Sequence, residues 1–259
     1  MCREYTQRVQ KMSRKLGVIG GTGLSVFEGL TIVKREIAQT PHGEPSAPLI
    51  YGEIDDKELV FLPRHGYGHT IPPHKVNYLA NIYALKDAGV THILAVAAVG
   101  GIRADMGPKS LVVPNQIIDY TYGRKCTFFE ESLSQVTHVD FTEPYCESMR
   151  QSILEVCKGQ NISVFDGGIY AATQGPRLET AAEINRLEKD GCDIVGMTGM
   201  PEAALARELE LNYACLAVVA NFAAGRDGSE NITMEAIEAN LAIAMNDAKA
   251  VIAQLAKII

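Results

Sequence analysis

The fold is decided by residues 168–221, which read GIYAATQGPRLETAAEINRLEKDGCDIVGMTGMPEAALARELELNYACLAVVAN. Short apolar runs typical of buried strands alternate here with longer segments whose apolar residues recur at helical spacing. The predicted elements are strands at 168–172, 193–197 and 213–221 and helices at 180–189 and 201–210. This alternation indicates a mainly parallel sheet covered by helices on both faces, with ligands at the carboxyl ends of the strands.

The same pattern extends toward both ends of the chain. Strands at 16–19, 31–37, 49–54 and 59–62 come first, and the turn at 55–57 indicates an antiparallel hairpin. The remaining predicted elements are a helix at 75–87, strands at 91–99 and 111–119, a helix at 143–158 and a final helix from residue 233. We therefore predict an α/β fold: one domain, residues 16–259, with a mixed, mainly parallel twisted sheet flanked by helices. Residues 1–15 are predicted to be an N-terminal extension, to which we assign no function.

Composition and charge exclude several classes of protein. Hydrophobic residues make up 47% and charged residues 21% of the chain, as in an ordinary globular protein with ample core. The net charge of −7 argues against a nucleic-acid partner, which usually needs a basic face. The six cysteines include no C-x-x-C, the usual zinc or redox spacing. No apolar run approaches the roughly 20 residues of a membrane span, and no signal-peptide pattern opens the chain. We expect a cytoplasmic protein without a membrane partner.

Glu179 and Asn221 form the most informative polar pair. Glu179 lies between the strand at 168–172 and the helix at 180–189, and Asn221 ends the strand at 213–221. A carboxylate only accepts hydrogen bonds, whereas a carboxamide offers a donor and an acceptor. Together they match a 6-oxopurine, whose N1–H needs an acceptor and whose O6 and N7 need a donor and an acceptor. Taken singly, a helix-start Glu and a strand-end Asn that bind nothing would be the better interpretation.

Two motifs in the first part of the chain could hold an anion. In the Gly20–Gly23 turn, Thr22 stands beside glycine N–H groups, which suits a phosphate, although a tight turn without a ligand is the alternative. The turn lacks the G-x-G-x-x-G spacing of a dinucleotide site. Arg64 offers a planar fork for an oxyanion, and His65 a further donor. A metal site that uses His65 and His69 is the weaker alternative, because no Asp, Glu or Cys cluster accompanies them.

Thr198 and Glu202 stand near the start of the helix at 201–210. Thr198 could offer its hydroxyl to an anion, although by itself a helix cap is the better interpretation. Glu202 is either a first-turn acid favoured by the helix dipole or a structural tie, and we favour a structural role.

With the anion motifs and Gly175-Pro176-Arg177 in this order, the chain resembles the trimeric purine nucleoside phosphorylases, specifically their 5'-methylthioadenosine phosphorylase branch. The likeness covers nearly all of the chain from Leu16 on. Its specific stretches are His69-Thr70-Ile71, Lys75-Val76-Asn77-Tyr78, Gly175-Pro176-Arg177, and Met197-Thr198 with Pro201-Glu202. Members of this family cleave the N-glycosidic bond of a purine nucleoside with inorganic phosphate. The resemblance implies a pentosyltransferase of purine salvage that is a homotrimer, with phosphate as co-substrate and neither metal nor organic cofactor.

The resemblance also implies roles for individual residues. Those implied to hold phosphate are Thr22, Arg64, His65, the backbone of Ala97 and Ala98, and Thr198. Those implied to bind the nucleoside are Met197 and His69 at the sugar, and Leu178, Glu179, Asn221, Phe222 and Ala223 at the base. His69 and Asn221 are the expected catalytic residues. Two positions depart from the methylthioadenosine enzymes: Leu178 stands where they carry an aromatic residue, and Ala97 replaces a hydroxyl residue.

Further departures indicate the substrate. Adenine-specific members have a hydroxyl residue at the position of Glu179 and aspartates at those of Asn221 and Ala223. Glu179 and Asn221 look like the pair in enzymes that act on inosine and guanosine. Those enzymes have a histidine for the 5'-hydroxyl where this chain has Met234, and a thioether there favours an apolar methylthio group. Ile237, one helical turn later, and His138 from a neighbouring subunit are expected to complete this pocket.

An oxopurine site joined to an apolar 5' pocket resembles the bacterial branch of the family that converts 5'-methylthioinosine to hypoxanthine and 5-methylthioribose 1-phosphate. A methylthioadenosine phosphorylase of relaxed specificity and an inosine/guanosine phosphorylase are the alternatives within the family. The missing dinucleotide spacing disfavours a nicotinamide-dependent oxidoreductase. The complete set of phosphate residues disfavours a non-catalytic nucleoside-binding module.

Overall fold

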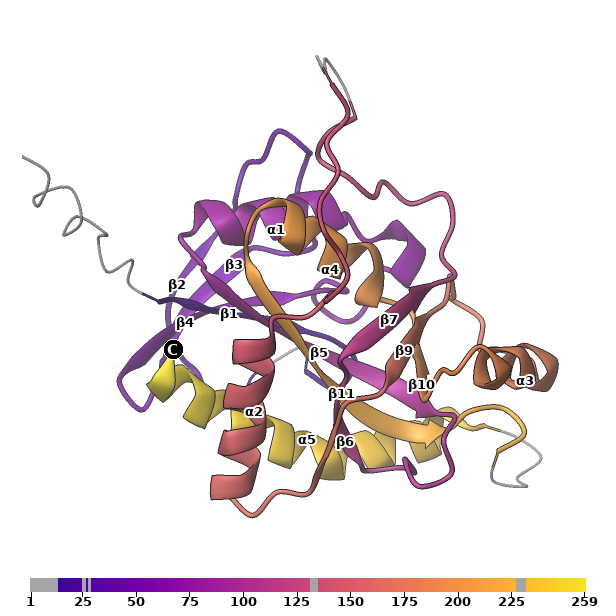
Figure 1. The fold of residues 1–259 in the computed structure, drawn as a ribbon. Helices are drawn as coiled ribbons and strands as arrows, with labels where there is room; N and C mark the ends of the chain where they lie inside the picture. Colours follow the sequence, from indigo (N-terminus) through magenta and orange to yellow (C-terminus); the bar gives the residue numbers. More distant parts are fainter. Residues whose placement is uncertain (1–13, 25–26, 28, 131–134, 227–231) are drawn as a thin grey trace, which may run out of the picture.

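A single sheet organises the protein. The computed structural model describes residues 14–24, 27, 29–130, 135–226 and 232–259. Over these residues eleven strands pair in the order β2-β3-β4-β1-β5-β10-β9-β7, with β11, β6 and β8 branching from β5 (Figure 1). The strands are β1 (Leu16–Gly20), β2 (Thr31–Glu36), β3 (Leu49–Ile54), β4 (Lys57–Pro63), β5 (His92–Gly101), β6 (Leu111–Val113), β7 (Gln116–Asp119), β8 (Val164–Asp166), β9 (Ile169–Ala172), β10 (Ile194–Gly196) and β11 (Asn212–Phe222).

Helices cover the sheet on both faces. They are α1 (Tyr78–Asp87), α2 (Glu147–Gly159), α3 (Ala181–Lys189), α4 (Gly199–Glu208) and α5 (Met234–Ile258) in the described part of the chain, with a short 3-10 helix at Pro73–Lys75. Most pairings between the described strands are parallel. The antiparallel pairings are those of β2 with β3, β3 with β4, β5 with β10 and β6 with β11. The predicted α/β class with a mixed, mainly parallel sheet is confirmed. Of the predicted N-terminal extension, only Arg14 and Lys15 lie within the described residues.

Strand β5 places the residues of the site. It pairs in parallel with β1 on one side and with β11 on the other. At its carboxyl end, Gly100 is in register with Asn221 of β11 and also, in antiparallel sense, with Val195 of β10. A Cβ atom on Gly100 would lie 3.2 Å from the Val195 side chain, so a glycine allows three strands to converge here. The residues that follow β10 therefore reach the same place as Asn221.

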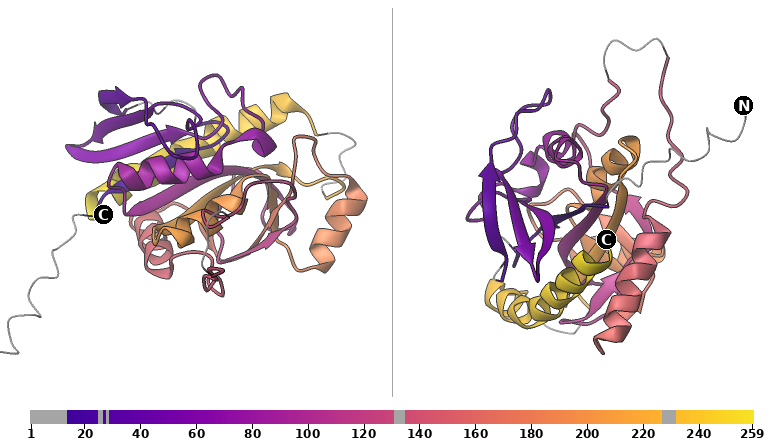
Figure 2. Two further views of the ribbon diagram at one scale, coloured as in Figure 1. Left: turned by 90° about the horizontal axis from the view of Figure 1, so that it is seen from above. Right: turned by 90° about the vertical axis from the view of Figure 1, so that its left-hand side faces the viewer.

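The side chains of β5 alternate between two large apolar clusters, as expected for a strand buried on both faces. Ile93 belongs to the cluster that packs against α1 and α4, and Leu94 to the cluster that packs against α2 and α5. Figure 2 shows these two pairs of helices on opposite sides of the sheet. A third, smaller cluster joins α3 to Val195. None of the helices in the described residues combines the length and apolar character that crossing a bilayer requires.

Two predicted elements differ in the structure. The predicted strand at 111–119 is two strands, β6 and β7. It is interrupted at Pro114, which has no N–H to donate, and at Asn115, whose Oδ1 accepts a hydrogen bond of 2.9 Å from the Gly168 N–H. Strand β8, which pairs in parallel with β6, was not predicted, because a three-residue run carries too little periodic signal.

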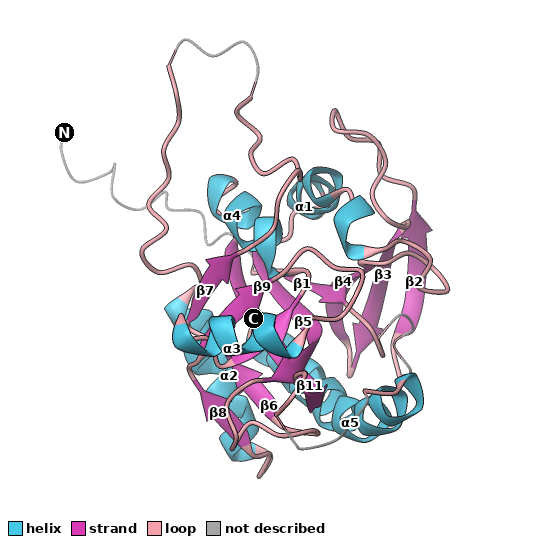
Figure 3. Cartoon of the chain, turned by 90° about the vertical axis from the view of Figure 1, so that its right-hand side faces the viewer, coloured by secondary structure: helices cyan, strands magenta, loops and turns pink. Residues whose placement is uncertain are grey.

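Two helices begin later than the sequence predicts. α1 begins at Tyr78 rather than at residue 75, because the Asn77 side chain caps it by accepting a hydrogen bond of 3.2 Å from the Ala80 N–H. α2 begins at Glu147 rather than at residue 143. The described part of the segment between β7 and α2, which carries His138, contains neither helix nor strand and projects away from the body of the protein (Figure 3).

Candidate active site

A cavity of about 420 Å³ opens at the carboxyl ends of β1, β5, β10 and β11. Parallel sheets of this type bind ligands at that edge. Most of the predicted site residues line this cavity. They are Thr22, Arg64, His65, His69, Ala97, Ala98, Leu178, Glu179, Met197, Thr198, Asn221, Ala223, Met234 and Ile237. The tertiary structure thus brings together segments that are far apart in the sequence.

Two predicted site residues do not line the cavity. Phe222 packs against Gly107, where an added Cβ atom would lie 2.8 Å from the Phe222 ring. It follows Asn221 in a strand, so its side chain points to the other side. His138 is exposed on the segment that projects from the body of its own chain (Figure 3). Within one chain, the cavity is therefore formed without His138.

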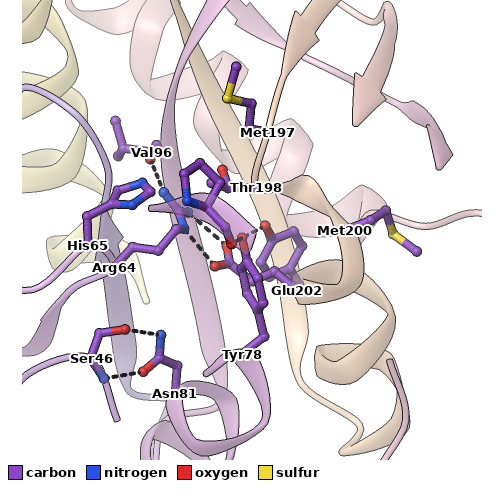
Figure 4. A network of polar contacts seen from close by, with 12 residues as sticks. Ser46, Arg64, His65, Tyr78, Asn81, Val96, Met197, Thr198, Met200 and Glu202 are labelled. Carbon is purple, nitrogen blue, oxygen red and sulfur yellow. Dashed lines mark hydrogen bonds and ion pairs between the residues drawn. The ribbon is translucent and has the colours of Figure 1, made fainter. Parts of the chain in front are cut away.

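Arg64 is the cationic centre of the cavity. Its Nε and Nη2 atoms donate to the two carboxylate oxygens of Glu202 at 2.7 and 2.8 Å, and Nη1 donates to the Val96 carbonyl at 3.0 Å (Figure 4). A guanidinium has five N–H donors, so these contacts leave one N–H on each terminal nitrogen for a ligand. Burial alone would lower the pKa of Arg64, but the charge of Glu202 and the hydrogen bonds to it outweigh burial and raise that pKa.

Glu202 is a positioning residue rather than a free acid. Its carboxylate is fully buried, and Oε1 also accepts a hydrogen bond of 2.9 Å from the Tyr213 hydroxyl. The structural role favoured from the sequence is confirmed, and its partner is Arg64. Gly21 packs directly on Arg64 and Val96, because a Cβ atom there would lie 2.6 Å from the Val96 carbonyl oxygen and 2.9 Å from Arg64 Nη1. The absence of a side chain at Gly21 thus allows the turn after β1 to lie close to the Arg64 guanidinium.

His65 presents an acceptor to the cavity. Its Nδ1 lies 2.8 Å from the Ile71 carbonyl oxygen, which can only accept, so Nδ1 carries the proton. Burial, and next the charge of Arg64, lower the pKa of His65 to about 4. The ring is therefore neutral near pH 7, and Nε2, which carries no proton, can accept a hydrogen bond from a ligand. The sequence predicted a donor here, but the bond to Ile71 and the neighbouring cation favour the opposite role. Burial and Arg64 also lower the pKa of His69, whose ring centroid is 4.4 Å from that of His65.

Thr198 stands at the N-cap position of α4, but its side chain makes no capping hydrogen bond. The cap interpretation is therefore wrong in this structure. The Thr198 backbone N–H donates to the Tyr170 hydroxyl at 3.4 Å, which fixes the start of the helix. Arg64 and His65 come from the loop after β4 and Thr198 from the loop after β10. All three line the cavity, and Figure 4 shows their side chains gathered together.

Glu179 and Asn221 line the same cavity, on the loop after β9 and at the end of β11. Glu179 Oε1 accepts a hydrogen bond of 2.6 Å from the Thr173 hydroxyl, which leaves Oε2 for a ligand. Asn221 Nδ2 donates one hydrogen to the Phe222 carbonyl at 2.6 Å, so the second amide hydrogen and Oδ1 remain. Glu179 can therefore accept one hydrogen bond from a planar base, and Asn221 can donate one hydrogen bond to that base and accept another from it.

Arg124 is a residue of the site that the sequence analysis missed. Its side chain donates to the carbonyl oxygens of Thr173 and Gln174 at 3.2 and 2.9 Å, and to those of Met197 and Met200 at 2.9 and 2.6 Å. It thereby joins the loop that carries Glu179 to the loop that carries Met197 and Thr198. Arg124 lies in an irregular stretch without hydrophobic periodicity, so no local pattern indicated this role.

No group of three or more His, Cys, Asp or Glu side chains that could hold a metal ion occurs among residues 14–24, 27, 29–130, 135–226 and 232–259. The cavity offers a ligand one buried cation, hydroxyl groups, a carboxylate, an amide and an apolar wall. This set suits an anion at one end and a polar planar ring at the other.

Comparison with known proteins agrees with this geometry. Residues 15–257 match the model of the Phosphorylase superfamily. A Pseudomonas syringae pv. tomato protein named "Probable S-methyl-5'-thioinosine phosphorylase" is 54% identical over 238 residues, which cover 92% of this chain and 96% of that protein. The 6-oxopurine nucleoside phosphorylase of Pyrococcus furiosus is 44% identical and covers 86% of this chain and 85% of its own length.

Solved structures show the same relationship. Methylthioadenosine phosphorylase from Schistosoma mansoni in complex with adenine superposes with a TM-score of 0.91 at 34% identity, covering 95% of this chain and 91% of that one. The sequence matches and the shared fold cover nearly all of the described residues. The chain therefore belongs to the phosphorylase superfamily, among the nucleoside phosphorylases that use phosphate as co-substrate.

Proposed function

We propose that this protein cleaves 5'-methylthioinosine with phosphate to give hypoxanthine and 5-methylthioribose 1-phosphate. The observation that carries the proposal is that Arg64, Glu179 and Met234 line one cavity. Arg64 suits phosphate, Glu179 suits a base with an N1–H, and Met234 suits an apolar group on the 5' carbon. The name of the Pseudomonas syringae relative agrees with this substrate.

The phosphate end would act by electrostatics. Cleavage of the glycosidic bond gives the sugar oxocarbenium character, and an anion held against it stabilises that charge. The two free N–H groups of Arg64 and the Thr198 hydroxyl would hold phosphate oxygens. Because His65 Nε2 is an acceptor, it would take a hydrogen bond from the protonated oxygen of hydrogen phosphate. The protein would thus position the nucleophile and would not need to deprotonate it.

The base end would stabilise the leaving group. Negative charge develops on the purine as the bond breaks, and the free amide hydrogen of Asn221 would donate to N7. An amide is no general acid near neutral pH, so the proton itself would come from water. Glu179 Oε2 would accept the N1–H of hypoxanthine. Adenine has an unprotonated N1, which would face this carboxylate with a lone pair, and the mismatch disfavours it.

The 5' end would be completed by a neighbouring subunit in a homotrimer. Met234 is 58% exposed in the single chain, although it lines the cavity. On the projecting segment, Val136 is 64% exposed beside His138. Apolar side chains exposed at a cavity mouth and on a projecting segment are typical of surfaces that another chain covers. We infer that this segment of one subunit covers the methylthio group in the next.

Product analysis tests the proposed reaction. We expect hypoxanthine to be released from 5'-methylthioinosine only when phosphate is present, and with higher kcat/KM than for 5'-methylthioadenosine or inosine. Equal cleavage of methylthioadenosine would identify a methylthioadenosine phosphorylase instead. Equal cleavage of inosine would identify a general 6-oxopurine nucleoside phosphorylase, the activity in the name of the Pyrococcus furiosus relative. Glu179→Ser combined with Asn221→Asp is expected to shift preference toward methylthioadenosine.

Light scattering tests the assembly. We expect a trimer under assay conditions, and Val136→Asp on the projecting segment is expected to dissociate it and raise KM for methylthioinosine. Ile243→Asp is the matched control, since Ile243 is an exposed apolar side chain on α5 outside the proposed interface. A monomer with full activity would contradict the shared site.

A further inference from the structure

Thr173 lies directly behind the base-recognising carboxylate. It follows the last residue of β9 and lines a second cavity, of about 380 Å³, on the far side of the 173–179 loop. Glu179 lines both this cavity and the candidate active site, whereas Thr173 lines only the second. The Glu179 carboxylate therefore stands between the two cavities, and Thr173 approaches it from the side opposite the substrate.

The Thr173 hydroxyl has two acceptors within reach but only one hydrogen. Its Oγ1 is 2.6 Å from Glu179 Oε1 and 3.3 Å from the Gly196 carbonyl oxygen. A hydrogen bond to an ionised oxygen is shorter and stronger than one to a neutral carbonyl, so the hydrogen goes to Glu179. One carboxylate oxygen is thereby occupied, and Oε2 is the oxygen left for a base.

The donor is held in place by the sheet. The Thr173 N–H donates to the Gly196 carbonyl at 2.8 Å, continuing the parallel register in which Ala172 pairs with Gly196. The Thr173 carbonyl accepts a hydrogen bond of 3.2 Å from Arg124. Glu179, by contrast, stands in a loop on a side chain with several rotatable bonds. A hydroxyl fixed to the sheet can therefore hold the orientation of that flexible carboxylate.

The cation nearest to Glu179 in sequence does not supply this anchor. Arg177 is exposed, and its two terminal nitrogens donate to both carboxylate oxygens of Glu183 at 2.8 and 2.7 Å. Among the described residues, the hydrogen bond from Thr173 is the one found at the Glu179 carboxylate. The orientation of that carboxylate therefore rests on Thr173.

We propose that Thr173 is the positioning residue for base selection: its hydroxyl fixes Glu179 Oε1 so that Oε2 accepts the N1–H of a 6-oxopurine. This inference rests on the proposed function and adds to it a residue that does not touch the substrate. It makes discrimination between purines depend on a hydroxyl outside the active-site cavity.

Binding of two bases in the presence of phosphate tests the proposal. Hypoxanthine carries an N1–H, whereas unsubstituted purine has a bare N1. By calorimetry, Thr173→Val, which keeps the side-chain shape, is expected to weaken hypoxanthine binding about ten-fold, the effect of losing a hydrogen bond to a charged group. Purine affinity is expected to stay within about two-fold, since purine makes no such bond to Glu179. Thr173→Ser retains the hydroxyl and is expected to restore hypoxanthine affinity.

A double-mutant cycle separates positioning from a general structural effect. In a Glu179→Ala background, Thr173→Val is expected to leave hypoxanthine affinity unchanged, because no carboxylate remains to be oriented. Equal weakening of both bases by Thr173→Val, or failure of Thr173→Ser to restore binding, would overturn the proposal. The proposal would also be overturned if Thr173→Val weakened hypoxanthine binding as much in the Glu179→Ala background as in the wild-type protein.

The wild-type protein distinguishes this inference from the proposed function. If it binds hypoxanthine no more tightly than purine, base recognition by Glu179 fails and the Thr173 inference fails with it. If wild type discriminates and Thr173→Val discriminates equally well, only the positioning role is overturned.

Discussion

Arg64 and Glu202 form a buried pair in which both carboxylate oxygens accept hydrogen bonds from one guanidinium, at 2.7 and 2.8 Å. Their side chains are 1% and 0% exposed, and the residues are 138 positions apart in the sequence. The pair fixes a cation at the end of the cavity while leaving part of its fork to a ligand. Phosphate affinity and stability should therefore both depend on Glu202.

We expect Glu202→Gln to raise KM for phosphate at least ten-fold and to lower the free energy of unfolding by about 3–5 kcal/mol, because it leaves a buried cation without its counter-charge. Phosphate titration and urea unfolding measure the two effects. Glu183→Gln is the control, since it breaks an exposed pair with Arg177 and should cost about 0–1 kcal/mol. Equal effects of the two substitutions would contradict the assignment.

The pKa of His65 predicts how stability depends on pH. The folded value of about 4 lies below the ordinary histidine value of 6.5, so the unfolded chain binds more protons between these values. The stability that neutral His65 contributes is therefore present above pH 6.5 and is lost as pH falls toward 4. Between pH 7.5 and 5, wild type should lose about 2 kcal/mol more than His65→Gln in urea unfolding. Parallel pH dependence of the two proteins would show that His65 is not held neutral.

Arg124 should matter for catalysis without touching substrate. Because it joins the loops that carry Glu179 and Thr198, Arg124→Ala should lower kcat/KM on the order of a hundred-fold through misplaced groups. Added guanidinium should restore part of the activity, which a simple loss of folding would not allow. Arg186→Ala, which removes an exposed arginine with an Asp190 partner at 3.7 Å, is the control and should retain full activity.

Met234→His should shift preference from methylthioinosine toward inosine. Burial of a methylthio group is worth about 1–2 kcal/mol, so the ratio of the two kcat/KM values should change roughly ten-fold. Met234 is largely exposed in the single chain, so this effect requires the neighbouring subunit that we propose covers it. An unchanged ratio in the trimeric variant would remove Met234 from the specificity pocket.

The sequence by itself determined the order and type of most elements, because hydrophobic periodicity is a local property of the chain. Arg64, Thr198 and Asn221 could be placed at one edge of the sheet because each follows or ends a predicted strand. The break at Pro114 was not predicted, because the partners of the two strands that it separates, β11 for β6 and β9 for β7, lie elsewhere in the sequence. The local hydrophobic pattern shows where strands lie in the sequence, but not which other strands they pair with.

Only the tertiary structure decided which partner each polar group has. The convergence of β5, β10 and β11 at Gly100 brings Asn221 to the residues after β10, and it depends on the register of three strands. The tertiary structure likewise determines three contacts of the site. It pairs Glu202 with Arg64, it sets which nitrogen of His65 carries the proton, and it brings the Thr173 hydroxyl to Glu179. Hydrogen bonds between distant segments form at specific distances, and those distances are set by packing and register rather than by local sequence.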